Sequence, residues 1–496
     1  MSRRKAFLSS FMALLVWLSI GVVCANEPVE PVIRHPRLGS CAHFHQASKG
    51  WVVETVMPLM ADSGLSWIRD EIKWEEFEKE QGVYQIPEKD IEWIEAANAH
   101  GLKVLLLFNT RGNRIYENPY DPEAYAKAAA WLAVELSGKI EALEVMNEPF
   151  NFKGMGKTFG GTWNGNDPES ATTGWIKAYV ELLNQAAEEV ENVAPKLKIV
   201  GLGAEAPANH RMLMLGISDK VDGLADHPYS RRVIPEQVLY AAGEGILRRD
   251  GIAVADEQGT FRSVVDLYRK SIESNGGPEE IWITETGFTT YSGLDRKTIH
   301  AGFTEEAQGK YLQRKIVEAL GLNVEVFIQY AFKDDGVNPD NAQHHFGLIR
   351  YDLSEKPAFG AVKRTAQAMA EYTTKNSAEV NVYPLGNRID SWPIVWDGTR
   401  IAAPGSIPVY QFINGDGESV LAIWSAERVG GDQCFRRADV EIIYDQPMQE
   451  IEVNDLWTGE IYTLKGKKTS TDAYVLEQMA IPDYPLLLTL KNIEGI

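Results

Sequence analysis

Two carboxylates that end apolar runs are the residues of this chain best suited to act together chemically. Glu148 follows one run within the triplet Asn147-Glu148-Pro149, and Glu285 closes a second run much later in the chain. Each run has the length of a buried strand, and Pro149 can continue neither a strand nor a helix. Side chains at the carboxyl ends of parallel strands meet at one edge of a sheet or barrel. One protonated and one ionised carboxyl brought together there is the minimum equipment for hydrolysing a glycosidic bond.

The elements that would position this pair follow from an alternation of two sequence patterns. Short apolar runs predict strands at residues 38–44, 67–72, 104–109, 143–147, 198–203, 223–227, 281–285 and 326–330. Between them, segments with helical spacing predict helices that include residues 91–100, 124–136, 175–190, 261–273, 305–320 and 357–372. This alternation predicts an α/β fold, a parallel (β/α)8 TIM barrel over residues 26–374. In that barrel Glu148 ends the fourth strand and Glu285 the seventh.

The sequence pattern changes after residue 374. Short alternating runs separated by turn residues replace the helical spacing, most clearly at residues 409–414, 419–425, 440–444 and 485–490. Asn414-Gly-Asp-Gly separates the first two runs and is typical of a hairpin turn. We therefore expect a small C-terminal β-sandwich over residues 375–496. Its expected role is to cover and stabilise the side of the barrel, and glycan binding is the alternative.

The first 25 residues have the pattern of a secretory signal peptide. A basic start at residues 3–5 precedes an apolar stretch, and Val23-Cys24-Ala25 has the small residues of a cleavage site. We expect a secreted or periplasmic protein, with an uncleaved membrane anchor as the alternative. The net charge of −21 argues against nucleic acid and anionic membranes as partners. Cys41 and Cys434 are too few for a disulfide scaffold, so both are expected to be free and buried.

The sequence contains no pattern that indicates a metal or cofactor site. His344 and His345 lie near three aspartates, but no spacing fixes two of these side chains on one face as metal ligands. No nucleophile elbow and no dinucleotide-binding glycine fingerprint follows a predicted strand. We therefore expect neither a metal nor a cofactor. The oligomeric state does not follow from the sequence.

The stretches around both carboxylates resemble one group of known enzymes. Asn147-Glu148-Pro149 at the fourth strand with Glu285 at the seventh is the pattern of the clan-A glycoside hydrolases, which are retaining (β/α)8 enzymes. Glu144-Val-Met-Asn-Glu-Pro is similar to the Glu-x-Trp-Asn-Glu-Pro of family 39, with Met146 where tryptophan is usual. Further stretches similar to family 39 or family 5 members extend the resemblance across the barrel and into the sandwich: residues 67–70, 74–84, 329–336, 346–349, 356–359 and 455–459.

The resemblance implies roles for the residues that match its motifs. Glu148 would be the acid/base and Glu285 the nucleophile. Asn147 would hydrogen-bond the 2-hydroxyl of the sugar, an interaction that strengthens in the transition state. Arg69 matches a second-strand arginine that keeps the nucleophile ionised, because an adjacent guanidinium lowers the pKa of a carboxyl. A buried ion pair with Glu144 is the alternative for Arg69.

Further residues at strand ends are candidates for binding the sugar. His227 and Tyr229 follow the sixth strand in a His-Pro-Tyr sequence that resembles a substrate-binding pair, and Tyr229 could contact either the nucleophile or the sugar ring. For both residues the alternative role is packing in the protein core. His43 and His45 end the first strand, from which they could reach a bound sugar.

Three aromatic residues are candidates for stacking on a sugar face. Tyr330 and Phe332 follow the eighth strand, where packing at the rim of the barrel is their alternative role. Trp163 lies in a glycine-rich loop after Glu148 and could form a platform over the cleft, unless the loop carries it elsewhere. These assignments lead to one expected function, a secreted retaining glycoside hydrolase that cleaves β-linked glycans, with endo action favoured. An exo-β-glycosidase similar to β-xylosidases and a non-catalytic carbohydrate-binding barrel are the alternatives.

Overall fold

The computed structural model describes most of the chain beyond the predicted signal peptide: residues 32–150, 154–167, 174–203, 205–238, 244–293, 298–386, 406–429, 435–446, 448–470 and 472–492. The predicted cleavage site, the alternative membrane anchor and Cys434 therefore lie outside the described residues. Within the described ranges, no helix has both the length and the apolar character needed to span a membrane. Cys41 is buried and free, as predicted.

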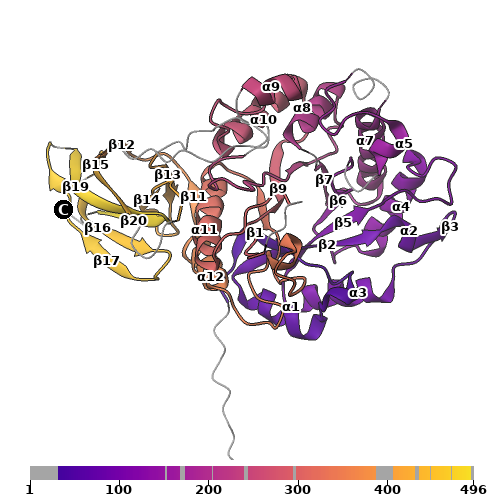
Figure 1. The fold of residues 1–496 in the computed structure, drawn as a ribbon, viewed down its shortest axis with the longest axis horizontal. Helices are drawn as coiled ribbons and strands as arrows, with labels where there is room; N and C mark the ends of the chain where they lie inside the picture. Colours follow the sequence, from indigo (N-terminus) through magenta and orange to yellow (C-terminus); the bar gives the residue numbers. More distant parts are fainter. Residues whose placement is uncertain are drawn as a thin grey trace, which may run out of the picture. The chain divides into compact units, whose positions relative to one another are not determined.

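Eight parallel strands close into a barrel in the order in which they occur along the chain (Figure 1). They are β1 (His35–Cys41), β2 (Leu65–Lys73), β5 (Lys103–Asn109), β6 (Ala142–Val145), β7 (Lys198–Leu202), β8 (Gly223–Asp226), β9 (Glu280–Thr286) and β10 (Val326–Gln329). Pairing of β10 with β1 closes the ring. All eight predicted strands are present, with ends that differ by a few residues, and the (β/α)8 prediction is confirmed. Helices cover the outer face, so strands such as β5 are apolar along most of their length.

The helices of the barrel lie outside the strands. The longer ones are α1 (Val53–Asp62), α3 (Glu88–Ala99), α4 (Pro122–Glu135), α7 (Trp175–Val193), α8 (Ala206–Leu215), α10 (Phe261–Asn275), α11 (Glu305–Gly321) and α12 (Pro357–Ala368). Short elements in the loops are η1 (Ala47–Lys49), α2 (Trp74–Phe77), β3 (Glu78–Glu80), β4 (Val83–Tyr84), α5 (Met155–Phe159), α9 (Glu244–Asp250) and η3 (Ala342–His345). Side-chain caps define several helix starts: Asp121 accepts from the Ala124 amide and Thr304 from that of Ala307.

The interior of the barrel changes from apolar to polar toward the carboxyl ends of the strands. Near the amino ends, Trp67 and Trp282 contact edge to face with ring centroids 5.4 Å apart and fill the floor. Two residues further along the same strands lie Arg69 and Thr284, because successive inward positions on a strand are two residues apart. Both of these polar side chains are buried. The alternation therefore gathers polar and charged groups at the mouth, where the loops after the strands can reach them.

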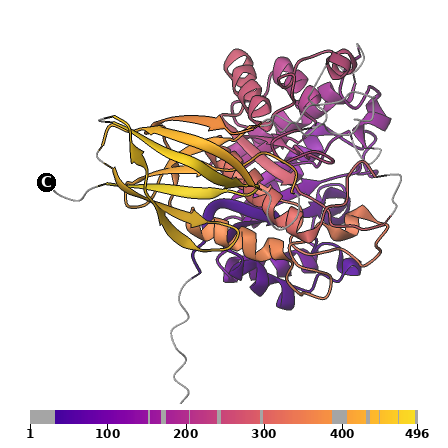
Figure 2. The same ribbon diagram turned by 60° about the vertical axis from the view of Figure 1, so that its left-hand side comes forward.

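The C-terminal region is a sandwich of two antiparallel sheets (Figure 2). One sheet has the order β11 (Thr373–Thr374), β13 (Val409–Ile413), β14 (Ser419–Ile423), β20 (Leu486–Asn492), β16 (Met448–Asp455) and β17 (Ile461–Leu464). The other has the order β12 (Glu379–Pro384), β15 (Phe435–Ile443), β19 (Ala473–Pro482) and β18 (Lys467–Lys468). Apolar residues from both sheets form a core of their own. The predicted sandwich and the predicted hairpin between β13 and β14 are confirmed.

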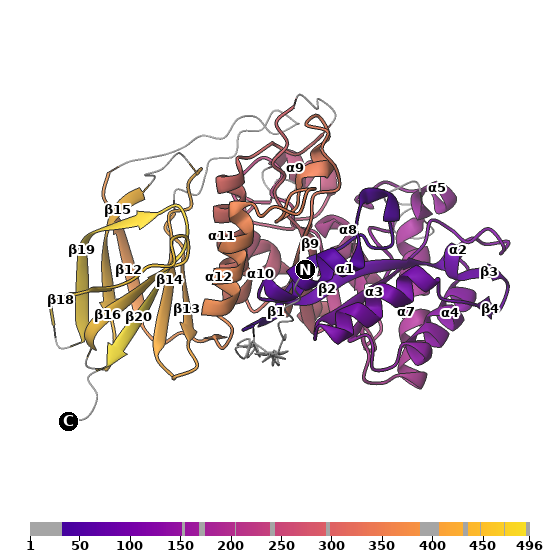
Figure 3. The ribbon, with the colours of Figure 1, turned by 90° about the horizontal axis from the view of Figure 1, so that it is seen from below.

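Two barrel helices connect the barrel to the sandwich. The described residues from Ile33 onward belong to one compact unit, and α11 and α12 lie between the barrel strands and β13 (Figure 3). Gln313 of α11 donates to the carbonyl of Leu456 at 2.7 Å, and Arg364 of α12 donates to the same carbonyl at 3.0 Å. The sandwich thus bonds directly to helices that pack on the barrel, as expected for a domain that covers its side.

Candidate active site

Both predicted carboxylates lie at the barrel mouth and come close together. One carboxylate oxygen of Glu148, one of Glu285 and one ring nitrogen of His227 all lie within 4.8 Å of each other. Glu285 belongs to β9, whereas Glu148 follows β6 after a turn in which Met146 and Glu148 have φ angles of 62° and 41°. A positive φ is uncommon for residues with a side chain and costs free energy, so the surrounding packing must hold this turn. The turn brings Glu148 toward Glu285.

Arg69 of β2 connects several groups beneath this pair. Its Nε donates to Oε2 of Glu144 at 2.5 Å, and its Nη2 donates to Oδ1 of Asn147 at 2.8 Å. Its Nη1 lies 3.3 Å from Oε2 of Glu285. Burial opposes the charge of Arg69, but Glu144, Cys41 and Glu285 together outweigh burial and raise the pKa of the guanidinium well above its usual value. Arg69 therefore contacts the predicted nucleophile and also forms the buried ion pair that was the alternative.

The second oxygen of Glu285 has a different donor. The hydroxyl of Tyr229 donates to Oε1 of Glu285 at 2.7 Å. Burial and the charge of Glu285 raise the pKa of Tyr229 well above its ordinary value, so the phenol keeps its proton and acts as a donor. Of its two predicted contacts, Tyr229 therefore makes the one with Glu285. Its side chain also lines the cavity described below.

His227 lies beneath the cavity and bonds to Glu148. Its Nδ1 is 2.9 Å from Oε1 of Glu148, and its Nε2 is 3.1 Å from Oγ1 of Thr284. Burial lowers the pKa of His227, but Glu285 and Glu148 outweigh burial and raise it to about 9. The imidazole is therefore protonated at neutral pH. His227 is not among the residues that line the cavity, so the structure places it against Glu148 and not where a sugar would touch it.

A chain of hydrogen bonds connects the two carboxylates below the cavity. The hydroxyl of Thr284 donates to Oε1 of Glu144 at 2.9 Å, and Glu144 in turn binds Arg69. The path therefore runs from Glu148 through His227, Thr284, Glu144 and Arg69 to Glu285. Each ring nitrogen of His227 thus has a protein partner, Glu148 for Nδ1 and Thr284 for Nε2.

Asn147 is held at the side of the pair. Its backbone N–H donates to Oδ1 of Asn109 at 3.2 Å, and its side-chain oxygen accepts from Arg69. With the oxygen engaged, the side-chain amino group is the part of Asn147 that remains to bind a ligand. Asn147 also lines the cavity, so its orientation fits the predicted contact with a sugar hydroxyl.

One wall of the cavity is an ion-paired cluster around Asp335. His43 Nδ1 lies 2.9 Å from Oδ1 of Asp335, Trp51 Nε1 donates to the same oxygen at 2.8 Å, and Lys49 Nζ donates to Oδ2 at 2.6 Å. Burial alone would raise the pKa of Asp335, but His43 and Lys49 outweigh it and hold the pKa below its usual range. His43 lines the cavity, as predicted for the end of the first strand.

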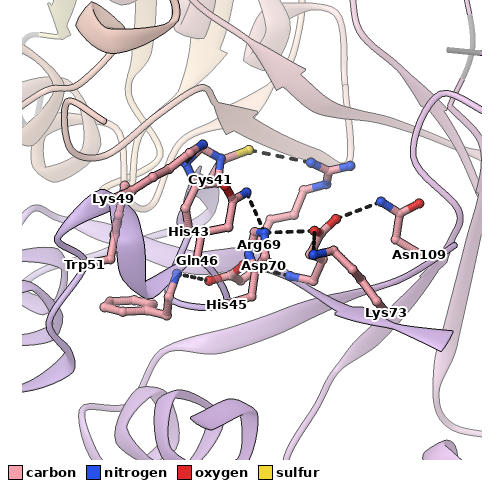
Figure 4. A network of polar contacts seen from close by, with 12 residues as sticks. Cys41, His43, His45, Gln46, Lys49, Trp51, Arg69, Asp70, Lys73 and Asn109 are labelled. Carbon is pink, nitrogen blue, oxygen red and sulfur yellow. Dashed lines mark hydrogen bonds and ion pairs between the residues drawn. The ribbon is translucent and has the colours of Figure 1, made fainter. Parts of the chain in front are cut away.

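The neighbouring part of the wall is built around His45 (Figure 4). Its Nδ1 forms a short contact with Asp70, and its Nε2 lies 2.8 Å from Oε1 of Glu71. Burial disfavours the imidazolium, but Asp70 and Glu71 outweigh burial and raise the pKa of His45 to about 9. Asn109 donates to Oε2 of Glu71 at 2.7 Å. The wall therefore presents fixed donors and acceptors to the cavity.

The cavity above the carboxylates has a volume of about 530 Å³. Polar side chains form much of its wall, among them Gln46, Lys49, Glu71, Asn109, Glu205 and Arg231. Tyr330 also lines it, and its ring packs against His43 with centroids 5.4 Å apart. Tyr330 therefore lies where a stacking contact with a bound sugar is possible. The arrangement suits a small polar molecule rich in hydroxyl groups.

The structure corrects two of the predicted stacking residues. Phe332 is fully buried and packs against Phe359 of α12, with ring centroids 6.2 Å apart, because its side chain points from the strand end toward the helices. Trp163 does not line the cavity, and its ring lies 4.8 Å from the guanidinium carbon of Arg249 on α9. Neither residue is placed to stack on a ligand between the two carboxylates.

Sequence reasoning also missed several residues of the site. Glu71 lies two positions after Arg69 on β2, and Thr284 lies two positions after Trp282 on β9. The two-residue repeat of inward positions was the signal that could have identified both. Glu205 and Arg231, which pair at 2.6 Å in the wall, lie in loops where no repeat applies.

Comparison with known proteins supports the fold. No protein-family model matches the chain, and no curated protein matches it in sequence. A family 39 glycoside hydrolase from the gut symbiont Bacteroides cellulosilyticus WH2 has a TM-score of 0.64 and 22% identity, with 92% of this chain and 81% of that chain covered. GH5_18 from Streptomyces cattleya has a TM-score of 0.46 and 16% identity, covering 67% and 80%. The endo-beta-1,4-mannanase from Thermotoga petrophila has a TM-score of 0.43 and 12% identity, covering 90% and 91%.

The similarity to the family 39 structure concerns the fold. It covers 92% of this chain at 22% identity. The predicted resemblance to family 39 is therefore confirmed at the level of architecture. What the site of this chain does must be argued from its own residues.

Proposed function

We propose that this chain is a secreted retaining glycoside hydrolase that cleaves β-glycosidic bonds by double displacement. The observation that carries the proposal is the separation of the two carboxylates, since an oxygen of Glu148 lies within 4.8 Å of an oxygen of Glu285. Carboxyl groups about 5–5.5 Å apart suit a retaining mechanism, whereas about 6.5–9.5 Å leaves room for the water of an inverting one. The spacing therefore favours retention.

In the first step, Glu285 attacks the anomeric carbon while Glu148 gives its proton to the leaving oxygen. The glycosidic bond breaks and a covalent bond from Glu285 to the sugar forms. In the second step, Glu148 takes a proton from water, which attacks the anomeric carbon and releases Glu285. Glu285 suits the first role because Arg69 and Tyr229 donate to its two oxygens and hold it in place.

The surroundings of Glu148 suit the role of proton donor and acceptor. Its Oε1 lies 2.9 Å from Nδ1 of His227, whose pKa is raised to about 9, so a protonated imidazole lies next to this carboxyl group at neutral pH. Asn147, the preceding residue, has its amino group available for the sugar hydroxyl next to the reacting carbon. Arg69 orients Asn147 and Glu285 with the same guanidinium, which aligns the sugar with the nucleophile.

The cavity supports a sugar as the substrate. Ion-paired side chains on one wall present fixed hydrogen-bonding groups, and Tyr330 offers an aromatic ring. Fixed donors and acceptors recognise hydroxyl groups without the entropic cost of ordering loose side chains. We propose cleavage within a glycan chain, with release of single sugars from chain ends as the alternative.

Proton NMR of the first product tests the mechanism. The β-anomer should appear first when a β-glycan or β-aryl glycoside is hydrolysed, and its α-anomer should follow only by mutarotation. Glu285→Gln should abolish turnover while sugar binding persists. If the α-anomer appears first, the retaining mechanism is wrong. If no β-glycan in a broad panel is hydrolysed but the wild type still binds sugars, the barrel is a binding module.

Two further measurements test the finer parts of the proposal. Chromatography of early products from polysaccharides should give oligosaccharides of several lengths if the enzyme acts within chains, and single sugars only if it acts at chain ends. N-terminal sequencing of the protein exported by its native host should begin after residue 25 if the signal peptide is cleaved. A start at residue 1 or 2 would instead support the membrane anchor.

A further inference from the structure

The segment that follows β8, residues 227–238, extends from the cavity to the sandwich. At its first end, Tyr229 donates to Glu285 at 2.7 Å and Arg231 pairs with Glu205 at 2.6 Å. At its other end lies Glu236, a glutamate with only 3% of its surface exposed. This segment, which we call the site segment, therefore contacts the predicted nucleophile at one end and buries a carboxylate at the other.

Glu236 is bound by both parts of the protein. Arg314 of α11 binds it in a bidentate manner, with Nε 2.8 Å from Oε1 and Nη2 2.5 Å from Oε2. The indole of Trp424, just after β14 of the sandwich, donates to Oε1 at 2.7 Å. Both partners are fully buried. Glu236 is thus fixed by one charged donor from the barrel and one neutral donor from the sandwich.

Other bonds make the site segment a rigid connection. Lys315 donates to the carbonyl of Pro235 at 2.8 Å, and Ser230 donates to the same carbonyl at 3.3 Å. The carbonyl of Glu236 accepts from the Phe261 amide at 2.8 Å. Arg314 also donates to the carbonyl of Glu427 in the sandwich at 2.7 Å. A displacement of Glu236 would therefore be passed along the backbone toward Tyr229.

A buried ion pair is a poor way to gain stability, because the cost of removing both charges from water offsets their attraction. The ion pair instead fixes the orientation of a side chain. Two hydrogen bonds from Arg314 and a third from Trp424 hold the Glu236 carboxylate in a single orientation. We propose that Glu236 is a positioning residue for the proposed reaction. Arg314 and Trp424 hold Glu236 and so fix the segment that presents Tyr229 to Glu285. The sandwich thereby sets the geometry of the site in addition to covering the barrel.

The test uses the full chain and a variant that leaves the ion pair intact. Glu236→Gln would leave Arg314 as an uncompensated buried charge and is expected to fold poorly. Trp424→Phe removes only the indole donor and keeps an aromatic ring. Tyr410→Phe is the matched control, because Tyr410 stacks on Trp424 with centroids 5.6 Å apart and donates to Glu318 of α11 at 2.9 Å. It loses one hydrogen bond at the same interface but none to the site segment.

Activity and amide hydrogen exchange are measured for each variant. For Trp424→Phe we expect kcat/KM on an aryl β-glycoside to fall about tenfold, since a misplacement of about 1 Å can cost about 100-fold. We also expect faster amide hydrogen exchange across residues 229–238. Tyr410→Phe should stay within about twofold of wild type in kcat/KM and leave that exchange unchanged, while its Tm falls by a similar amount to that of Trp424→Phe.

The inference requires both changes in Trp424→Phe and neither in Tyr410→Phe, so any other combination overturns it. Should Trp424→Phe fail to fold, Glu236→Asp tests the same positioning role, because it keeps the charge but shortens the reach of the carboxylate to both Trp424 and Arg314. The activity readout rests on the proposed function, whereas the exchange readout does not. If the wild type hydrolyses no glycan, the proposed function fails, and unchanged exchange in Trp424→Phe is then the separate result that overturns the inference.

Discussion

The Nδ1 atom of His227 lies 2.9 Å from Oε1 of Glu148. Burial lowers the pKa of His227, but the neighbouring carboxylates outweigh burial and raise it to about 9. The imidazole of His227 is therefore protonated at neutral pH and lies against the Glu148 carboxyl group. Glu148, the residue proposed to protonate the leaving oxygen, thus lies in direct contact with a protonated imidazole.

Replacement of His227 should change the pH dependence of activity. In the wild type, His227 loses its proton as pH rises through about 9, so kcat/KM should fall along an alkaline limb near that pH. His227→Asn removes the group that titrates there, so the alkaline limb near pH 9 should be absent. A pH profile of kcat/KM for both proteins measures this, and an unchanged limb near pH 9 would show that His227 does not produce it.

The hydroxyl of Tyr229 should matter for the geometry of Glu285 more than for folding. Tyr229→Phe removes the donor 2.7 Å from Oε1 of Glu285 and leaves the ring in place. We expect kcat/KM to fall by about 10–100-fold, since the nucleophile loses one of the two groups that orient it. The Tm should change by only a few degrees, because one hydrogen bond contributes about 1 kcal/mol. If the Tm of Tyr229→Phe falls so far that the variant is unfolded at the assay temperature, unfolding explains the lost activity and this assignment is refuted.

Glu144 should be essential for stability. Its side chain is fully buried and pairs with Arg69, so Glu144→Gln leaves part of a buried guanidinium charge uncompensated. We expect the free energy of unfolding to fall by about 3–5 kcal/mol. Urea denaturation measures the change. Glu123→Gln, which breaks an exposed ion pair with Lys127, is the control and should leave the midpoint unchanged.

His45 should make the stability of the protein depend on pH. Its pKa is about 9 in the folded protein, raised from an ordinary value of 6.5 by Asp70 and Glu71 against the opposing effect of burial. A raised folded-state pKa gives stability that is fully present below about 6.5 and lost as pH rises through about 9. The shift corresponds to about 3 kcal/mol. His227, whose pKa is also raised to about 9, contributes to the pH dependence of both proteins. The difference between the urea midpoints at pH 6 and pH 9.5 should therefore be smaller for His45→Gln than for the wild type, and equal differences would exclude this role.

Some parts of the site were accessible from the sequence because they depend on position along a strand. Residues at strand ends of a parallel barrel share one mouth whatever their side chains are, so the convergence of Glu148 and Glu285 followed from the strand order. The same rule placed Arg69 and His43 correctly. It failed for Phe332, because three residues beyond the end of β10 the chain has turned and the side chain faces α12.

By itself, the sequence determined the order of strands and helices, the barrel, the sandwich and the pair of carboxylates at the mouth. These features follow from the local spacing of apolar residues, because each helix or strand must bury one or both of its faces. Only the tertiary structure decided which partner each polar group takes: Arg69 binds Glu144 as well as Glu285, and His227 bonds to Glu148 beneath the cavity. Partner choice depends on the paths of loops and on distances between strands that are remote in the chain, and residue type and spacing contain neither.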